Sequence, residues 1–254
     1  MRIVSICPSN TELASCLGLT GQLVGVDDFS DWPEEIASLP KVGPDLSIDM
    51  DKVEELKPDL ILASLSVPGM EKNIEELEKR NLPYVVYNPQ SLDDIANDLL
   101  HLGEITGIPE KAAEYVQNYR NRLSAFKEAA SNRKKKPRIY FEWWPNPIFT
   151  PGRVNWLTEI SKLAGASNIF EDVDLASVQT DWEDVLKRDP DYIFLAWVGV
   201  KQSRMKIEHV LKRANAEKAK AVKEKQIHLL EEALYCRPSP RLLEGLEKLA
   251  QILK

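Results

Sequence analysis

The chain has few of the residues and motifs on which catalytic or metal-binding sites are usually built. Its three cysteines include no Cys-x-x-Cys pair, which argues against a disulfide framework and against a zinc site. The three histidines stand singly, with no second histidine or cysteine at metal-ligand spacing. The motifs of nucleotide-binding enzymes, zinc proteases and α/β hydrolases are absent. We therefore expect no catalytic residues, no bound metal and no cofactor.

Charge and hydropathy argue against two further classes of protein. The net charge is −7, from 33 basic and 40 acidic residues, whereas a dedicated nucleic-acid binder needs a basic surface. The one basic run, residues 133–136, reads as the solvated end of a helix, with a docking patch as the alternative. No stretch approaches the roughly 18 apolar residues of a membrane-spanning helix. We expect no nucleic-acid partner and no direct membrane insertion.

The location of the protein stays open at this stage. The first predicted strand follows Met1-Arg2 directly, with no signal peptide before it. The expectation is cytoplasmic if the chain is complete as written, and extracytoplasmic, in the periplasm or at the cell surface, if an export signal was removed.

The sequence does contain two β/α series that flank one long helical segment. In residues 108–136, apolar side chains recur at threes and fours after Pro109 with no internal proline or glycine, which predicts a long amphipathic helix. Strands alternate with helices on both sides of it, as in mostly parallel sheets. We predict an α/β fold with two Rossmann-like lobes, at residues 1–107 and 137–254, joined by this helix and separated by a ligand cleft.

Each lobe has a predicted order of strands and helices. Strands are expected at residues 3–7, 23–26, 59–63 and 84–87 in the first lobe, and at residues 138–142, 193–197 and 227–230 in the second. In the second lobe we expect a proline-rich loop at residues 143–152 and a helical region at residues 203–223.

A short stretch in the second lobe repeats one in the first. Residues 181–195 match residues 49–62 in an aspartate, a valine, a Pro-Asp pair and an isoleucine, at a constant offset of 132 residues. The repeat predicts the same unit in each lobe: an acidic helix, a turn and a buried strand.

Aromatic residues gather in the loops that should follow the strands. In open parallel sheets, ligands bind at the carboxyl ends of the strands. The predicted ligand-binding residues are Phe29, Trp32, Trp143, Trp144, Phe149, Trp197 and Tyr235. Packing under the loops is the alternative for each of them. A cleft lined in this way suits a bulky, flat and partly apolar ligand.

Four short motifs carry a family resemblance over nearly the whole chain. They are Pro8-Ser9-Asn10-Thr11-Glu12, Val24-Gly25-Val26, Lys57-Pro58-Asp59-Leu60-Ile61 and Arg237-Pro238-Ser239-Pro240-Arg241. In this order they resemble the substrate-binding proteins of ABC importers for vitamin B12 and ferric siderophores, and most of all the vitamin B12-binding members. The resemblance implies a monomer with two lobes on a rigid helix that clamps a small molecule and delivers it to a permease.

The resemblance also implies roles for particular residues. Glu71 corresponds to a first-lobe glutamate that docks on the permease. The second docking glutamate is replaced by Cys236, and Glu232, or its neighbour Glu231, is the expected substitute. Phe29 corresponds to an aromatic of the vitamin B12 pocket, whereas three pocket tryptophans are replaced by Asp45, Ser64 and Leu234.

The expected function is therefore capture of cobalamin or a related corrinoid without catalysis. A ferric siderophore or haem is the alternative ligand. A cytoplasmic corrinoid carrier or sensor, and an enzyme acting on a tetrapyrrole, are the alternative functions that the fold alone leaves open.

Overall fold

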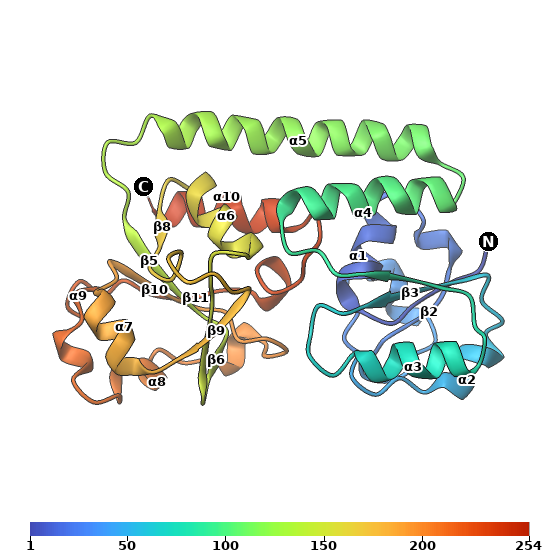
Figure 1. Ribbon diagram of the computed structural model, residues 1–254, viewed down its shortest axis with the longest axis horizontal. Coiled ribbons are helices and arrows are strands. Elements are labelled where there is room, and N and C mark those ends of the chain that lie inside the picture. The colour runs from blue at the N-terminus through green and yellow to red at the C-terminus, as the bar shows by residue number, and fades with distance from the viewer. Residues whose placement is uncertain (254) are drawn as a thin grey trace. The chain divides into compact units, whose positions relative to one another are not determined.

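The computed structural model describes residues 1–253, and the chain divides into two compact units (Figure 1). The N-terminal unit comprises residues 1–89, 93–119 and 238–240. The C-terminal unit comprises residues 90–92, 120–237 and 241–254. Helix α5 (Pro109–Ser131) contributes its first half to one unit and its second half to the other.

The N-terminal unit is built on a four-stranded parallel sheet. Its strands are β1 (Ile3–Ser5), β2 (Leu23–Val26), β3 (Leu60–Ser64) and β4 (Tyr84–Tyr87), in the order β2-β1-β3-β4. All three pairings are parallel. Apolar runs without alternation form these strands because both faces of the sheet are covered. The predicted parallel sheet is thus confirmed for this unit.

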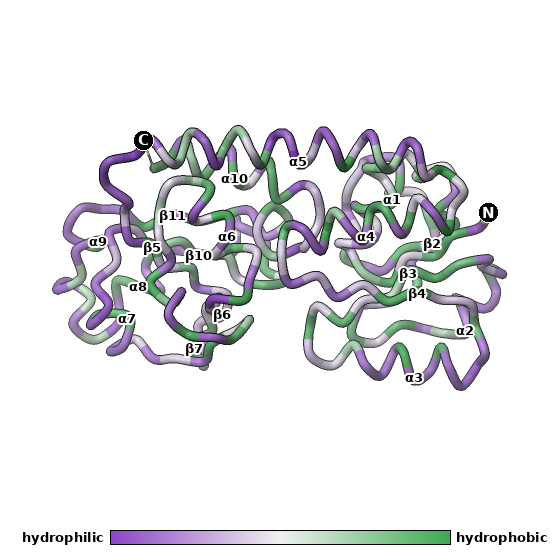
Figure 2. Tube along the Cα trace, turned by 45° about the horizontal axis from the view of Figure 1, so that its top comes forward, coloured by the Kyte–Doolittle hydropathy of each residue, from purple (hydrophilic) through white to green (hydrophobic). Residues whose placement is uncertain are grey.

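Helices cover both faces of this sheet. The helices α2 (Met50–Glu55) and α3 (Glu71–Lys79) pack on one face through a core cluster that includes Val53 and Leu77. The other face carries α1 (Pro8–Cys16) and α4 (Leu92–Ile105), although residue 92 is grouped with the other unit (Figure 1). Figure 2 shows hydrophobic residues along β3 and β4 and hydrophilic ones along much of α3. Short 3-10 turns span Thr20–Gln22 and Glu34–Ser38.

The C-terminal unit repeats this sheet. Its strands are β5 (Arg138–Glu142), β8 (Ser167–Asn168), β10 (Tyr192–Leu195) and β11 (Ile227–Leu229), in the order β11-β10-β5-β8. The pairings are again parallel. Matched by position in each series, β5, β8, β10 and β11 correspond to β1, β2, β3 and β4. The two sheets therefore share one strand order.

Irregular and short helices cover one face of the second sheet. The helices are α7 (Trp182–Arg188), α8 (Glu208–Leu211) and α9 (Lys220–Lys223), with 3-10 turns at Gln202–Arg204, Ala216–Lys218 and Glu232–Leu234. They bury Val185, Val210 and Ala221 in one core cluster. The helical region predicted at residues 203–223 is confirmed only as separate short pieces, and the left-handed conformation of Asn215 marks one of the breaks between them. The helices α6 (Trp156–Leu163) and α10 (Leu242–Ile252) contact each other.

The proline-rich segment differs from its predicted loop. It forms an antiparallel hairpin of β6 (Trp144–Pro145) and β7 (Ile148–Pro151), which β9 (Ser177–Thr180) extends to three strands. Pro145 lies in the edge strand β6, where proline is tolerated, Pro147 lies in the turn between β6 and β7, and Pro151 is the last residue of β7. Trp144 and Phe149 are directly opposite in this hairpin.

The sequence repeat corresponds to a repeated structure. Asp49 and Asp181 each cap a helix by accepting a hydrogen bond from the backbone N–H three residues on. Next, Lys57 and Asp189 adopt left-handed conformations with φ of 48° and 43°. The unit of helix, turn and strand predicted from the 132-residue offset is therefore confirmed.

In both units, the aspartate after this turn is hydrogen-bonded to the arginine just before the first strand, and we call this contact the latch. Asp59 accepts a hydrogen bond from the backbone N–H of Arg2, at 2.7 Å, and Asp191 accepts one from that of Arg138, at 2.8 Å. Each arginine side chain also donates to a carbonyl at the end of the helix that precedes the turn, Leu56 after α2 for Arg2 and Arg188 in α7 for Arg138. The latch lies where the two central strands of each sheet begin.

Within residues 1–253, no helix is both long and apolar enough to cross a membrane.

Candidate functional site

In the N-terminal unit, the loop after β2 presents one aromatic side chain to solvent. Phe29 is 47% exposed, which is unusual for so large an apolar group unless it serves a contact. The loop begins at Asp27, whose backbone N–H pairs with Ser5 at the end of β1. Trp32 is partly buried in the same loop. The loop thus lies at the carboxyl ends of β1 and β2, as predicted.

This unit has polar residues at two positions where the resemblance predicts aromatics. They are Asp45 and Ser64. Ser64 is buried and its hydroxyl donates to Ser66 at 2.9 Å. The Asp45 carboxylate interacts electrostatically with Asp27. This side of the unit is therefore more acidic and less aromatic than the resemblance implies.

In the C-terminal unit, the β6–β7 hairpin presents a second exposed aromatic. Trp144 is 42% exposed, and its indole N–H donates to the carbonyl of Asn146 within the hairpin at 3.1 Å. Phe149, its cross-strand neighbour, is partly buried. The hairpin follows β5 directly, so Trp144 lies at the carboxyl edge of the second sheet.

Trp143 lies deeper than its neighbour. Its ring centroid is 5.7 Å from that of Trp156, and its indole nitrogen is buried without a hydrogen-bond partner among the described residues. Its backbone pairs with Phe149 and Val198, which ties the hairpin to the loop after β10. We infer from this packing that Trp143 supports the hairpin from beneath.

Trp197, a predicted ligand-binding residue, is almost fully buried. It is 7% exposed, its indole N–H donates to Glu142 at 3.2 Å, and its ring meets His209 edge-on at 5.0 Å. Glu142 is fully buried at the end of β5 and also accepts the hydroxyl of Tyr140. Trp197 is therefore a structural residue in this conformation, because its polar atom is needed by a buried carboxylate.

Tyr235 is also placed in the core and not on a ligand surface. It is 1% exposed, and its hydroxyl donates to the backbone carbonyl of Gly245 in α10 at 2.8 Å. Burial raises the pKa of this phenol well above its usual range. Cys236 beside it is held by the carbonyl of Ala196 at 3.0 Å. A ligand contact by Tyr235 is not supported by this packing.

The two glutamates predicted to dock on a permease differ in availability. Glu71 is exposed at the start of α3 and accepts the backbone N–H of Gly69 at 2.7 Å. Glu232 pairs with Arg237 at 3.0 Å, and its side chain is only 15% exposed. Its neighbour Glu231 is more open and pairs with Lys248 on α10.

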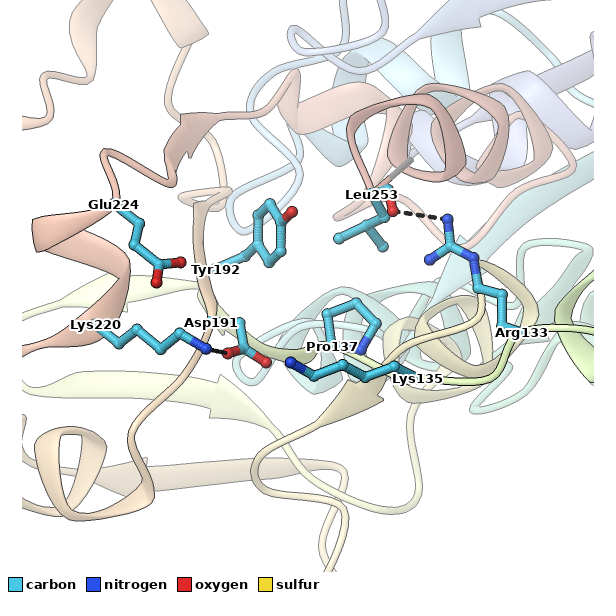
Figure 3. Close-up of a pocket in the computed structure, with 8 residues that line it drawn as sticks. All are labelled: Arg133, Lys135, Pro137, Asp191, Tyr192, Lys220, Glu224 and Leu253. Atoms are coloured by element: carbon cyan, nitrogen blue, oxygen red, sulfur yellow. Dashed lines mark hydrogen bonds and ion pairs between the residues drawn. The ribbon is translucent and has the colours of Figure 1, made fainter.

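A cavity of about 350 Å³ lies elsewhere in the C-terminal unit (Figure 3). Its wall includes Asp191 and Tyr192, where β10 begins, so it opens at the sheet edge opposite the aromatic loops. Its charges are largely satisfied, since Lys220 pairs with Asp191 and Arg133 donates to the Leu253 carbonyl at 2.7 Å. The remaining lining residues are Lys135, Pro137 and Glu224. This cavity does not belong to the predicted ligand site.

Residues 1–253 contain no group of three or more His, Cys, Asp or Glu side chains that could hold a metal ion.

Two parts of the site were missed by sequence reasoning. Asp27 beneath the Phe29 loop was assigned to the loop without a role. The ion pair of Glu142 with Arg213 joins residues 71 positions apart, at 2.6 Å. The Asp27-Asp28 pair directly after a buried strand was a usable signal for the first, whereas no sequence pattern indicates the second.

Comparison with known proteins places the chain among transporter components. Residues 3–234 match the periplasmic binding protein family. The whole chain is 31% identical to the vitamin B12-binding protein of Vibrio cholerae serotype O1, of which it covers 89%. It is also 31% identical to an uncharacterized ABC transporter substrate-binding lipoprotein of Bacillus subtilis, over 98% of this chain and 79% of that protein.

Solved structures agree with this placement. The crystal structure of the periplasmic vitamin B12 binding protein of Vibrio cholerae superposes with a TM-score of 0.80 at 28% identity, over 99% of this chain and 96% of that one. A Staphylococcus aureus protein complexed with heme gives a TM-score of 0.86 at 19% identity, over 99% and 98% of the two chains. At that identity the likeness to the heme complex concerns the fold.

Proposed function

The chain belongs to the periplasmic binding protein family, and from this premise we propose that it captures cobalamin or a related corrinoid without catalysis and delivers it to the permease of an ABC importer. The family comprises substrate-binding proteins of transporters, so a small-molecule ligand and a permease partner follow from membership. The corrinoid is our proposal.

The observation that carries the proposal is one exposed aromatic at the carboxyl edge of each sheet. Phe29 and Trp144 are 47% and 42% exposed on loops that begin directly after strands. Exposed aromatics in such positions favour ligands with broad apolar surfaces, and a corrin ring offers one. The full-length similarity to a vitamin B12-binding protein supports the same ligand.

Charge on the N-terminal unit favours a corrinoid over an anionic ligand. The exposed residues Asp28 and Asp31 flank Phe29 in sequence, and the Asp45 carboxylate acts on the same loop. The nearby Lys41 ammonium binds backbone carbonyls of the loop. Complementarity of charge favours a neutral or cationic corrinoid over haem propionates or a ferric catecholate.

Titration with candidate ligands tests the proposal. Tryptophan fluorescence and calorimetry would be recorded with cyanocobalamin, cobinamide, haemin and a ferric hydroxamate siderophore. We expect one-to-one binding of a corrinoid with submicromolar affinity and recovery of the ligand chemically unchanged. Binding of haemin or the siderophore alone would contradict the corrinoid assignment, and conversion of the ligand would contradict a purely binding role.

Haem is the second candidate because of one exposed imidazole. His209 lies on α8, exposed, with its ring against Trp197, and histidine is a common axial ligand of haem iron. If haem is the ligand, haemin should give a sharp Soret band that His209→Ala abolishes. A Soret band unchanged in this variant would remove the argument for haem.

For permease docking we propose Glu71 together with Glu231. Glu71 is exposed, and Glu231 is the more open member of the pair that follows β11. Glu232 is engaged by Arg237, so breaking that pair would cost stability. Association with the purified importer should weaken in Glu71→Gln and Glu231→Gln, with a reduced dependence on salt. Glu55→Gln, an exposed carboxylate on α2, is the matched control.

A further inference from the structure

One buried carboxylate accepts hydrogen bonds from the turn that carries Phe29. Asp27 follows β2 and is fully buried. Its Oδ1 accepts hydrogen bonds from the backbone N–H groups of Phe29, at 2.8 Å, and of Ser30, at 3.0 Å. Its Oδ2 accepts the hydroxyl of Ser30. All three bonds converge on the turn from which Phe29 projects.

A row of buried hydroxyls connects this turn to the first strand. The hydroxyl of Ser30 also contacts that of Thr11 on α1 at 2.7 Å. Thr11 donates in turn to the hydroxyl of Ser5 at the end of β1, at 2.8 Å. These residues are all buried. Ser30 gives its one hydroxyl hydrogen to Asp27 and Thr11 gives its own to Ser5, so the Ser30–Thr11 contact packs the turn against α1 without a hydrogen of its own while the Asp27 carboxyl is ionised.

The Lys41 side chain binds the backbone of the same turn. Its ammonium donates to the carbonyls of Asp27, at 3.2 Å, and Ser30, at 2.6 Å. Because the Phe29 side chain is itself half exposed, its position depends on the backbone that these groups hold. Asp27 and Lys41 each make two hydrogen bonds to that backbone, and Asp27 alone of the two also binds the Ser30 hydroxyl.

We infer that Asp27 is the positioning residue that holds the Phe29 loop in its ligand-binding conformation. The inference rests on the proposed function, because Phe29 matters to a ligand only if this surface binds one. Asp27 itself is buried and acts through Phe29.

The charge of Asp27 makes this role dependent on pH. Burial raises the pKa of its carboxyl to about 6, against the opposing effect of its hydrogen bonds. The Asp45 carboxylate raises the pKa further. Two other titratable groups lie nearby: the Cys7 thiol before α1, whose own pKa Asp27 raises, and the Lys41 ammonium, which is bonded to the Asp27 backbone carbonyl. The closed loop therefore favours the protonated carboxyl, which titrates near 3.8 when the loop opens to water. The loop should be held more firmly below pH 6 and less firmly as the pH rises through 6.

The test combines three variants with two measurements. Asp27→Ala removes the acceptors, Asp27→Asn keeps one acceptor without the titration, and Ser30→Ala removes only the hydroxyl. Corrinoid affinity would be measured from pH 5 to pH 8, and hydrogen exchange of the Phe29 and Ser30 amides would be followed in ligand-free protein. Glu55→Gln serves as the control.

We expect roughly tenfold weaker corrinoid binding and roughly tenfold faster amide exchange in Asp27→Ala, as for the loss of more than one hydrogen bond. Wild type should bind more weakly as the pH rises through 6, because the buried carboxyl then becomes charged, and Asp27→Asn should lack that step. If Asp27→Ala fails to fold, the Asp27→Asn profile and Ser30→Ala carry the test.

Unchanged affinity, exchange and pH profile in the Asp27 variants would overturn the inference. If wild type binds no corrinoid, the proposed function fails, while amide exchange in the ligand-free variants still decides whether Asp27 positions the loop. Altered exchange with unaltered corrinoid affinity would show that Asp27 shapes the loop without serving the ligand, which also overturns the inference.

Discussion

The guanidinium of Arg213 forms two parallel hydrogen bonds with the carboxylate of Glu142, at 2.6 and 2.9 Å. The carboxylate is completely buried, and the Arg213 side chain is 14% exposed. Trp197 and Tyr140 donate to the same carboxylate. Every one of these partners lies in the C-terminal unit, so the pair joins the end of β5 to the irregular segment that follows α8.

Loss of the arginine should strongly destabilise the protein. In Arg213→Met, the Glu142 carboxylate would stay buried without its counterion, which typically costs about 3–5 kcal/mol. We expect a decrease of that size in the free energy of unfolding by urea, and a recovery when Glu142→Gln is added. Lys212→Met, at the exposed neighbouring position, should change little. A change below about 1 kcal/mol in Arg213→Met would mean that water replaces the guanidinium.

Asp98 should make stability depend on pH. Burial first, and then the charge of Asp94, raise the pKa of its carboxyl to about 7, and its Oδ2 has no hydrogen-bond partner within residues 1–253. A raised pKa means that the protonated form is favoured in the folded state. This stabilisation is complete below the unfolded pKa near 3.8 and is lost as the pH rises through 7.

The corresponding experiment compares wild type with Asp98→Asn between pH 4 and pH 9. After allowance for the partial exposure of Asp98, we expect the wild-type free energy of unfolding to fall by about 1–2 kcal/mol as the pH rises over this range, because Asp98 ionises. The variant should lack that decrease and be the more stable protein at pH 8. Parallel curves for the two proteins would show that Asp98 titrates normally.

Exposed and buried aromatics should respond differently to substitution. Trp144→Ala should weaken corrinoid binding by about tenfold and change the free energy of unfolding by less than about 0.5 kcal/mol. Tyr235→Phe should leave binding intact and cost about 1 kcal/mol of stability, because it leaves the Gly245 carbonyl without its donor. Leu175→Ala, a second exposed apolar position, is the control. A binding defect in Tyr235→Phe would restore Tyr235 to the ligand site.

Two glycines with opposite surroundings should give opposite results on substitution by alanine. A Cβ at Gly245 would overlap the carbonyl oxygen of Leu234, whereas nothing lies within 4 Å of a Cβ at Gly21. Gly245→Ala should lower the free energy of unfolding by about 1–3 kcal/mol. Gly21→Ala should raise it by about 0.5 kcal/mol through the lower entropy of its unfolded chain. Equal effects in urea unfolding would contradict the close packing of α10.

Except for β8, the strands of both parallel sheets could be predicted from local sequence. Apolar runs identified the central strands, and Asp49 and Asp181 marked the helix starts because caps and periodicity act between near neighbours. The hairpin at Trp144 was missed because its prolines indicate turns, and only β9, distant in sequence, completes its sheet. The breaks between α8 and α9 were not predicted, because tertiary packing, and not helical propensity, determines where such short helices form.

The candidate site was harder to predict than the framework. Sequence identified the loops, and within them Phe29 and Trp144 are indeed exposed. It could not separate these from Trp197 and Tyr235, since burial depends on which distant groups accept their polar atoms. Glu142 and Gly245 are those groups, and neither is a sequence neighbour of its partner.

The paired latches at Arg2–Asp59 and Arg138–Asp191 have a consequence for how this protein can change. They fasten both sheets at the edges where the central strands begin, whereas the aromatic loops leave from the opposite edges. Because substitutions more than about 7–10 Å apart usually have additive effects on stability, the loops can be exchanged or lengthened without loosening the latches. The two sheets can therefore keep their structure while single loops change to fit new ligands.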